Sequence, residues 1–596
     1  MNPSTACATV LVDELIRLGC RHAVLSPGSR SAPLAYALAE ADASGRLRLH
    51  VRVDERSAGF LALGLGKATR TPVPVVTTSG SAPAHLHPAV LEADAARVPL
   101  LVLTADRPPE LRGVGANQTT DQVKLYGSAV RWSADLETPA AGAGQDGAGA
   151  VESWRAAAWR TAIDRAWVAA RGDRGGDAGP VHLNLPFRDP LAPDLDGAGD
   201  PPALDGRPGG APWTKVSGPG GSASAQWWSA RGFACGTEPL DDVPATLVIL
   251  GDLDAPEAST RAIEIARAHG WPVLAEPFGR RPRGVIPHGP LLLQADPSFV
   301  AAHPPERILV VGRLTLTRTL AAYLRTPGPR VELVAPERIW PDPGHVACRV
   351  YPWEALAGRG RVGVQAVRSA HDDAWSKAWR EAGERVAEAA APGLVWPEGA
   401  APDGPALASA LLAALPGGAR LFVGSSNAAR DLDVARREDE LELVANRGVA
   451  GIDGAISTAA GMALAGDRPT YALLGDLTFL HDSNGLLIGP QEPRPDLTVI
   501  VADDRGGGIF ARLEYGQAGR ERFFERIFTT PTDVDLASLC AAHGVDYREA
   551  QTPRELAGAV ARRPRGLRVV HVRLDADRQR DALTRLSARV TRGLST

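Results

Sequence analysis

Short apolar runs recur along the chain, and each leads through a turn into a helical pattern. Near the N-terminus, apolar residues spaced three and four positions apart predict a helix over 8–18 that stops at Gly19. The β-rich runs that follow predict strands at 22–26, 49–53, 73–77, 100–104 and 181–185. Strands that alternate with helices in this way form parallel, doubly wound sheets.

The same alternation returns twice further along, which predicts an α/β protein with three doubly wound parallel-sheet domains in series. A stretch rich in Gly, Pro, Ser and Ala separates the first domain from the second and is typical of a linker or insertion. The predicted boundaries are 1–195 for the first domain, 196–242 for the linker or insertion, 243–390 for the middle domain and 391–596 for the last domain.

Composition and charge exclude several classes of function. The 596 residues carry a formal net charge of −4, which is not the basic footprint of a nucleic-acid-binding protein. No uninterrupted apolar run reaches the roughly 18 residues of a membrane span, and Asp13 and Glu14 in the first helical pattern argue against a signal peptide. Five cysteines without CxxC spacing favour a reducing compartment. We expect a cytoplasmic protein without stable membrane insertion.

Two strand ends in the last domain carry carboxylates beside glycines. One strand ends at Gly475-Asp476, and the next ends at Asp503-Asp504, just before Arg505 and three glycines. Parallel strands would bring these carboxylates to one sheet edge, where they could hold a Mg²⁺ that carries a diphosphate. A single Gly-Asp pair is more often an acidic turn, but two such ends favour a metal site.

Motifs in both outer domains resemble the thiamine-diphosphate-dependent decarboxylase superfamily. Within it, the chain is similar to the menaquinone-pathway family that makes 2-succinyl-5-enolpyruvyl-6-hydroxy-3-cyclohexene-1-carboxylate (SEPHCHC). The middle domain contributes little to the resemblance. The matching segments are PGSRSAPL (27–34), DERSAGFLALGLGK (54–67), LTADRPPEL (103–111), GANQTTDQ (115–122), GPVHLNLPF (179–187), NRGVAGIDGAISTAAG (446–461) and GDLTFLHDSNG (475–485).

The resemblance implies that the first domain binds the pyrimidine ring of thiamine diphosphate and that the last domain binds its diphosphate and metal. Glu55 matches the glutamate that exchanges a proton with the pyrimidine, although Asp54-Glu55-Arg56 also looks like a charged helix start. The implied ligands of Mg²⁺, or of Mn²⁺ as an alternative, are Asp476, Asp504 and the carbonyl of Gly506, with Asp503 left open in place of Asp504. Further implied cofactor contacts are Gly424, Ser425, Ser426, Ile452, Gly475 and Leu477.

The implied substrates are 2-oxoglutarate and isochorismate, which each carry two carboxylates. Arginine suits such groups because its planar fork binds a carboxylate through two hydrogen bonds. The positions that match the family are Arg30, Arg107, Arg430 and Arg447, assisted by Ser29, Asn117 and Gln118. Taken singly, each arginine is more often a solvated surface charge. Some relatives have a lysine where Thr317 aligns, and we do not assign the neighbouring Arg318 to substrate binding.

The sequence therefore predicts a carboligase that decarboxylates 2-oxoglutarate and adds the resulting succinyl carbanion to isochorismate. In the superfamily, the first domain of one subunit meets the last domain of another, which implies a homodimer or a tetramer. One alternative is another thiamine-diphosphate decarboxylase or carboligase, which would not need this set of arginines. Another is a silent regulatory paralogue, but Glu55 and Asp476 are present. A nicotinamide dehydrogenase is disfavoured because PGSRS replaces GxGxxG after the first strand.

Overall fold

The computed structural model describes residues 1–140, 153–194, 204–216, 240–241, 243–253, 256–335, 340–356, 370–466, 468–517 and 519–595. Most of the predicted linker 196–242 lies outside these residues. Contacts divide the chain into two compact units. The first unit comprises Met1–Ala230, Gly448–Gly466 and Asp482–Pro495, and the second comprises Arg231–Arg447, Asp467–His481 and Asp496–Thr596.

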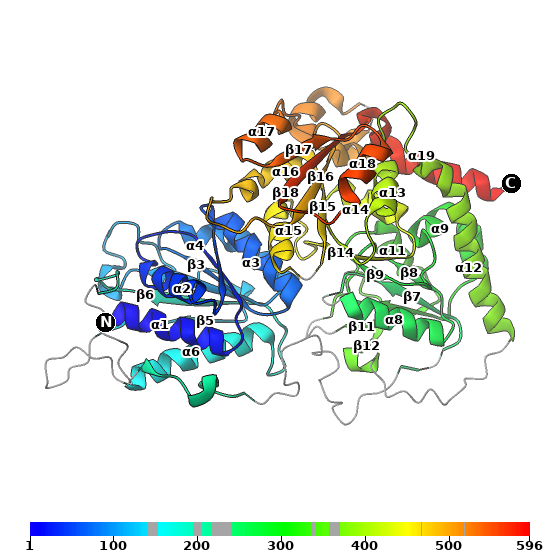
Figure 1. Cartoon of the computed structure of the whole chain (residues 1–596). Helices are drawn as coiled ribbons and strands as arrows, with labels where there is room; N and C mark the ends of the chain where they lie inside the picture. The colour runs from blue at the N-terminus through cyan, green and yellow to red at the C-terminus, as the bar shows by residue number, and fades with distance from the viewer. Residues whose placement is uncertain are drawn as a thin grey trace, which may run out of the picture. The chain divides into compact units, whose positions relative to one another are not determined.

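The first unit is built on a six-stranded parallel sheet with the order β2-β1-β3-β4-β6-β5. Apolar residues of α1, α2 and α6 form one core with the sheet, and α3 packs on β1 and β3 (Figure 1). Its strands are β1 (His22–Leu25), β2 (Arg48–Val51), β3 (Val73–Thr77), β4 (Leu100–Asp106), β5 (Trp132–Asp135) and β6 (Pro180–Pro186). Its helices are α1 (Pro3–Arg17), α2 (Ala32–Ala43), α3 (Glu55–Thr69), α4 (Ala82–His85), α5 (His87–Ala95), α6 (Ser153–Arg171) and α15 (Ala455–Leu464).

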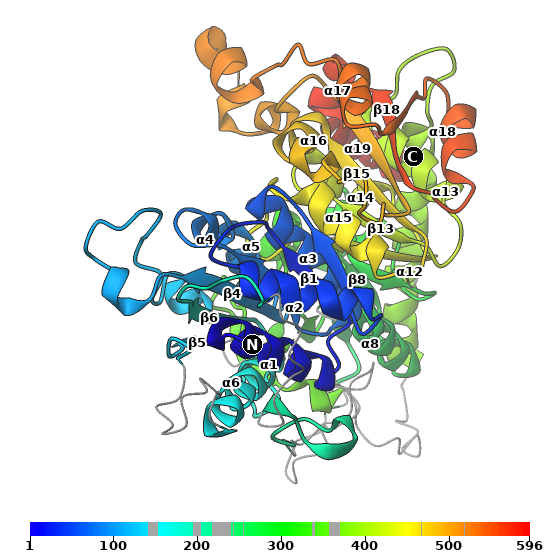
Figure 2. The ribbon, with the colours of Figure 1, turned by 60° about the vertical axis from the view of Figure 1, so that its left-hand side comes forward.

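Helix α15 comes late in the chain, yet it packs directly on α3, as Figure 2 shows for the yellow and blue helices. A Cβ atom added to Gly64 of α3 would lie 2.0 Å from the carbonyl oxygen of Thr458. A Cβ atom added to Gly461 of α15 would lie 2.2 Å from the carbonyl oxygen of Leu61. The two backbones therefore touch where only glycine fits, and this contact fixes α3, which begins at Glu55.

The second unit contains two sheets. The five-stranded sheet is parallel and has the order β12-β11-β10-β7-β8. Its strands are β7 (Thr246–Leu250), β8 (Val273–Ala275), β10 (Arg307–Val311), β11 (Arg330–Val334) and β12 (Ala347–Tyr351). The seven-stranded sheet has the order β17-β18-β16-β15-β13-β14-β9. Its strands are β9 (Gly279–Arg281), β13 (Arg420–Val423), β14 (Asp439–Ala445), β15 (Thr470–Gly475), β16 (Leu497–Asp503), β17 (Asp546–Glu549) and β18 (Leu567–Arg573).

Three parallel α/β sheets in series are thus confirmed, with one antiparallel addition. Strand β9 comes from the predicted middle domain and pairs antiparallel with β14 at the edge of the seven-stranded sheet. The buried guanidinium of Arg436 donates to the carbonyl oxygens of Gly279 (3.0 Å) and Leu441 (3.0 Å), on the two paired segments. This edge strand ties the two sheets of the second unit together.

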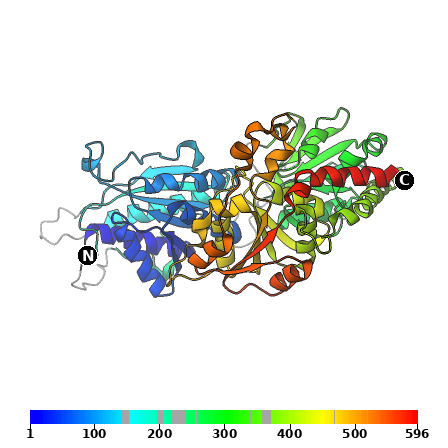
Figure 3. The same ribbon diagram turned by 90° about the horizontal axis from the view of Figure 1, so that it is seen from above.

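Helices cover both sheets of the second unit. The two longest, α12 and α19, pack against each other, and Leu586 and Val590 of α19 share a core with Trp379 of α12. Figure 3 shows α19 in red, leading to the C-terminus. The helices are α8 (Pro256–Ala268), α9 (Gly289–Ala295), α10 (Pro297–Ala302), α11 (Arg318–Tyr323), α12 (Ala370–Ala390), α13 (Gly404–Ala414), α14 (Asn427–Ala435), α16 (Asp476–His481), α17 (Leu536–Ala542), α18 (Pro553–Val560) and α19 (Ala576–Ser595). Among the described residues, no helix combines the length and the apolar character needed to cross a membrane.

Candidate active site

Glu55 is the first residue of α3 and lies just after β2 in the first unit. Asp54 caps this helix: its Oδ1 accepts hydrogen bonds from the backbone N–H groups of Arg56 (2.8 Å) and Ser57 (3.3 Å). The Oδ2 atom of Asp54 accepts a further hydrogen bond from Nδ2 of Asn484 (2.7 Å). The charged helix start considered for this motif is therefore present. The cap fixes the backbone position of Glu55, whose side chain is partly buried.

A second buried carboxylate, that of Asp482, holds α3 and α15 together. It accepts hydrogen bonds from the backbone N–H (2.7 Å) and hydroxyl (3.2 Å) of Ser457 and from the hydroxyl of Ser57 (3.4 Å). Burial raises the pKa of Asp482 to about 6. Sequence reasoning missed this residue, although it stands inside the GDLTFLHDSNG motif.

Arg107 in the first unit is held by a small polar network at the ends of β3 and β4. Its Nη1 donates to the hydroxyl of Ser79 (2.5 Å), which donates in turn to the carbonyl oxygen of Gln118 (3.0 Å). The side-chain amide of Gln118 donates back to the carbonyl oxygen of Ser79 (3.0 Å). Burial and the positive charge of Arg30 both lower the pKa of Arg107. The structure therefore brings together two of the predicted substrate residues, Arg107 and Gln118, and adds Ser79, which the sequence analysis did not single out.

The other predicted residues of the first unit have different surroundings. Nη1 of Arg30 donates to the carbonyl oxygen of Phe187 (2.9 Å) and lies 3.6 Å from a carboxylate oxygen of Asp189. Ser29 and Asn117 are exposed. Ile452 is partly buried in the segment Gly448–Gly466, which belongs to the first unit by its contacts.

In the second unit, the acidic strand ends converge as the sequence predicted. Asp476 begins α16 and accepts hydrogen bonds from the backbone N–H groups of Leu477 and Gly506. Burial and the negative charges of Asp504 and Asp503 raise the pKa of Asp476 to about 8. Carboxylates that repel one another in this way suit a divalent cation, which would neutralise them.

The two candidate metal ligands Asp503, which ends β16, and Asp504, which follows it, have different partners. Asp503 Oδ2 lies 2.9 Å from Nε2 of His571, and its Oδ1 accepts the backbone N–H of Arg505 (2.9 Å). Asp504 instead accepts a hydrogen bond from Nδ2 of Asn427 (3.2 Å), at the start of α14. Within the described part of the chain, no three His, Cys, Asp or Glu side chains form a ready metal site. A cation here would therefore rely on two carboxylates, a backbone carbonyl and oxygens of its ligand.

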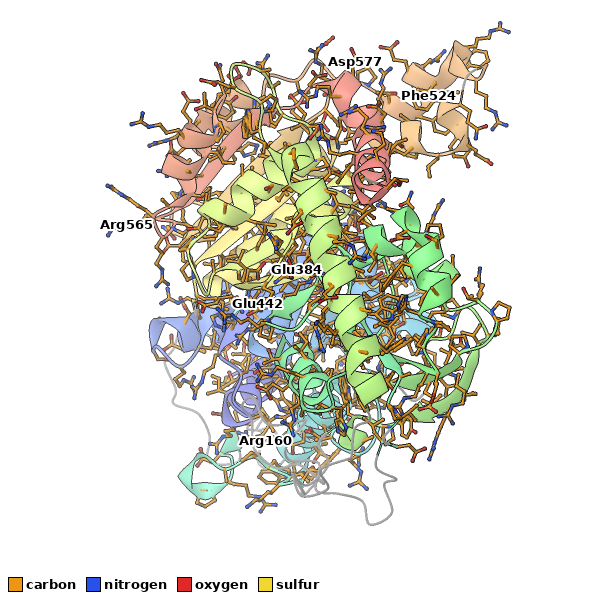
Figure 4. All side chains as sticks on the ribbon, turned by 90° about the vertical axis from the view of Figure 1, so that its right-hand side faces the viewer. Arg160, Glu384, Glu442, Phe524, Arg565 and Asp577 are labelled. Atoms are coloured by element: carbon orange, nitrogen blue, oxygen red, sulfur yellow. The ribbon has the colours of Figure 1, made fainter. Side chains whose placement is uncertain are left out.

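Glycines and a strained serine surround these carboxylates. Gly506 has φ 127°, and a Cβ atom added to it would lie 2.2 Å from the carbonyl oxygen of Thr529. Gly424-Ser425-Ser426 joins β13 to α14, next to the end of the neighbouring β15. Ser426 has φ 74°, which costs a non-glycine residue about 1–3 kcal/mol. Backbone N–H groups at this helix start suit a phosphate. The chain after Gly506 continues to the rim of the unit, where Figure 4 marks Phe524.

Four arginines lie close together in the second unit. Arg430, one turn into α14, donates from Nη1 to the carbonyl oxygen of Ser426 (2.8 Å). Burial and the positive charges of Arg447, Arg512 and Arg318 lower the pKa of Arg430. Arg430 and Arg447 were predicted substrate ligands, whereas Arg318 was set aside and Arg512 was missed. Arg318 begins α11 and Arg512 ends a short 3₁₀ helix (Gly508–Arg512), so only the three-dimensional structure shows that they lie near Arg430.

Two family models match the chain, and both describe thiamine pyrophosphate enzymes. The N-terminal TPP binding domain matches residues 5–125, and the C-terminal TPP binding domain matches residues 423–572. Glu55 lies in the first match, and Asp476 and Asp504 lie in the second. The predicted membership of this superfamily is confirmed.

Relatives match over nearly the whole chain, including the middle domain. The chain is 46% identical to the 2-succinyl-5-enolpyruvyl-6-hydroxy-3-cyclohexene-1-carboxylate synthase of Saccharopolyspora erythraea, over 99% of both chains. It is also 46% identical to the enzyme of that name from Kineococcus radiotolerans, over 99% of both chains. A third relative of that name, from Thermobifida fusca, is 46% identical over 96% of both chains.

Proposed function

Because the chain belongs to the 2-succinyl-5-enolpyruvyl-6-hydroxy-3-cyclohexene-1-carboxylate synthase family, we propose that it catalyses this step of menaquinone biosynthesis. The reaction decarboxylates 2-oxoglutarate and adds the resulting succinyl carbanion to isochorismate. When bound, thiamine diphosphate supplies the carbon that attacks the ketone and holds the electron pair left by CO₂. The chain's own residues bind, orient and exchange protons around it.

One observation supports the proposal above the others. Helix α14 carries a residue that contacts a candidate metal ligand and, one turn further on, a candidate substrate arginine. Asn427 at its start bonds Asp504, and Arg430 three positions later lies in the group of four arginines. A dicarboxylate held by these guanidinium groups would therefore lie beside the diphosphate and metal. Smaller or monoanionic substrates would make less use of this concentration of positive charge.

The residues present fit the cofactor and its metal. Asp476, Asp504 and the carbonyl of Gly506 would hold Mg²⁺, or Mn²⁺, with the His571 contact of Asp503 favouring Asp504 as the ligand. Gly424, Ser425, Ser426, Gly475 and Leu477 would contact the diphosphate, and Ile452 would pack against the cofactor. Glu55 would exchange a proton with the pyrimidine ring.

The substrate carboxylates would bind arginines from both outer domains. Arg30 and Arg107, with Ser29, Asn117 and Gln118, would act from the first domain, and Arg430 and Arg447 from the last domain. We propose that the first domain of one subunit completes the site on the last domain of another, in a homodimer or a tetramer. A cytoplasmic location stays a prediction from the sequence.

The test is an assay of purified protein with thiamine diphosphate, Mg²⁺ and 2-oxoglutarate, with and without isochorismate. We expect an isochorismate-dependent adduct together with CO₂. Release of CO₂ without that adduct would point to another decarboxylase or carboligase, and absence of both reactions in cofactor-loaded protein would point to a silent paralogue.

A further inference from the structure

A buried carboxylate of the middle domain holds a loop of the second unit by four hydrogen bonds. Glu276 follows β8, and its Oε1 accepts the backbone N–H groups of Leu316 (2.7 Å) and Thr317 (2.8 Å). Its Oε2 accepts the backbone N–H (2.9 Å) and the hydroxyl (3.2 Å) of Thr315. A carboxylate that accepts several backbone N–H groups fixes a loop as firmly as a helix cap does.

The Thr315 hydroxyl links this carboxylate to Arg447. Since an ionised carboxylate only accepts hydrogen bonds, the hydroxyl proton goes to Glu276, and the hydroxyl oxygen is left to accept from Arg447. Nε of Arg447 lies 3.3 Å from that oxygen, and its Nη2 donates to the carbonyl oxygen of the same threonine. One edge of the guanidinium is therefore anchored at two points on a single residue.

Other contacts restrain the Arg447 guanidinium and the loop 315–317 that holds it. The guanidinium carbon of Arg447 lies 5.7 Å from the ring centre of Phe278, two residues after Glu276. Thr317 donates through its hydroxyl to Asp433 (3.4 Å) of α14, the helix that also carries Arg430. The loop 315–317 thus connects the middle domain to two of the elements that carry the predicted substrate arginines.

We propose that Glu276 and Thr315 are positioning residues that set the plane of the Arg447 guanidinium for a substrate carboxylate. Anchoring the edge formed by Nε and Nη2 determines where the end of the guanidinium, Nη1 with Nη2, points. The inference rests on the proposed function in taking Arg447 as a substrate ligand. It gives the middle domain, which has neither cofactor-binding motif, a direct part in substrate selection.

The first experiment measures steady-state kinetics of Thr315→Val, which removes the hydroxyl but keeps the backbone carbonyl and the shape. We expect the KM of one substrate to rise about ten-fold, the size of one lost charge-assisted hydrogen bond, with kcat changed less than about two-fold. Thr315→Ser should restore the KM because it returns the hydroxyl. Thr319→Val, four positions along, is the matched control and should behave as the wild type.

Glu276→Gln tests the carboxylate. The NH₂ of the new glutamine would face N–H and O–H donors of the loop, and two of the four hydrogen bonds would be lost. We therefore expect a larger rise in the same KM. Arg447→Lys should raise that KM as well, and adding Thr315→Val to Arg447→Lys should cause little further change, because the anchored edge is already gone. Additive effects, or a fall in kcat with unchanged KM, would overturn the inference.

A second readout does not depend on turnover. The Nε proton of Arg447, assigned by its loss in Arg447→Lys, should exchange with solvent at least about five-fold faster in Thr315→Val than in the wild type or Thr319→Val. Equal exchange rates would overturn the inference even if the proposed reaction is found. If the wild type forms no adduct but the exchange rates differ as expected, the proposed function fails and the positioning role stands.

Discussion

Asn484 donates a 2.7 Å hydrogen bond to Asp54, although 430 positions separate the two residues. The bond joins a loop of the last TPP-binding domain to the cap of the helix that begins with Glu55. The position of this glutamate therefore depends on residues from both ends of the chain. This relationship leads to the first prediction.

Replacing Asp54 by alanine should affect both stability and turnover. Loss of the cap should lower the free energy of unfolding by about 1 kcal/mol, measured by thermal or denaturant unfolding. Because Glu55 is the next residue, kcat should fall about five-fold or more from its lost orientation. Asp535→Ala removes the cap of α17, where Asp535 accepts the backbone N–H of Ala537, and should lower stability alone. Equal losses of kcat in both variants would contradict the link to Glu55.

Asp482 should make the protein less stable as the pH rises. Its pKa is about 6 in the folded state against 3.8 ordinarily, so folding favours its protonated form. The stabilisation is complete below about pH 3.8 and is lost as the pH rises through 6, by up to about 3 kcal/mol. Asp482→Asn, which does not titrate, should therefore gain stability relative to the wild type as the pH rises from about 4 to about 7.

The measurement for Asp482 is unfolding by denaturant at several pH values. The exposed Asp577→Asn (Figure 4 marks this residue) is the control and should run parallel to the wild type. A constant difference between Asp482→Asn and the wild type at all pH values would contradict the prediction.

The two aspartates at the end of β16 should differ in metal binding. Asp504→Asn should weaken Mg²⁺ binding about ten-fold or more, because it removes a charged ligand. Asp503→Asn should have the smaller effect, since the Asp503 side chain is held by His571. Titration of activity and of thermal stability with Mg²⁺ after treatment with EDTA distinguishes the two. If Asp503→Asn weakened Mg²⁺ binding more than Asp504→Asn, Asp503 would be the metal ligand in place of Asp504.

The contact between α3 and α15 should tolerate no side chain. Gly64→Ala and Gly461→Ala would each place a Cβ atom against a backbone carbonyl oxygen, and each should destabilise the fold by about 1–3 kcal/mol. Gly558→Ala in α18 has open space around the new Cβ atom and should instead stabilise by about 0.4–1 kcal/mol. Comparing the three unfolding transitions separates close packing from helix propensity.

Strands with continuous apolar runs could be predicted from the sequence with accurate boundaries. β3 has the predicted range 73–77, and β4 and β6 extend the predicted ranges 100–104 and 181–185 by two residues each. The first helix starts five residues earlier than its apolar pattern, because Asn2 caps it and Pro3 occupies its first turn. Strand β14 escaped prediction since three of the seven residues in its sequence DELELVA are charged. Glu442 within it is buried against Arg420 (3.1 Å), a pair that no local pattern reveals.

The sequence indicates candidate residues for the site but does not predict the contacts between them. The sequence alone placed Asp476 and Asp504 at strand ends, where β15 and β16 end in the structure, whereas Arg430 lies one turn into α14. The contact partners of candidate residues come from distant parts of the chain: His571 lies 68 positions from Asp503, and Thr315 lies 132 positions from Arg447. Such pairs depend on which strands become neighbours, and that is decided by packing of the whole unit.

The late position of α15 has a consequence for the newly made chain. The end of α3 and the start of α15 lie 455 − 69 = 386 positions apart, so a ribosome adding roughly 5–20 residues per second needs about 20–80 s between them. Throughout that interval the face of α3 around Phe60 and Gly64 has no permanent cover. The apolar surface of α3 that α15 covers would therefore stay exposed on the nascent chain for tens of seconds, and a chaperone could bind it there.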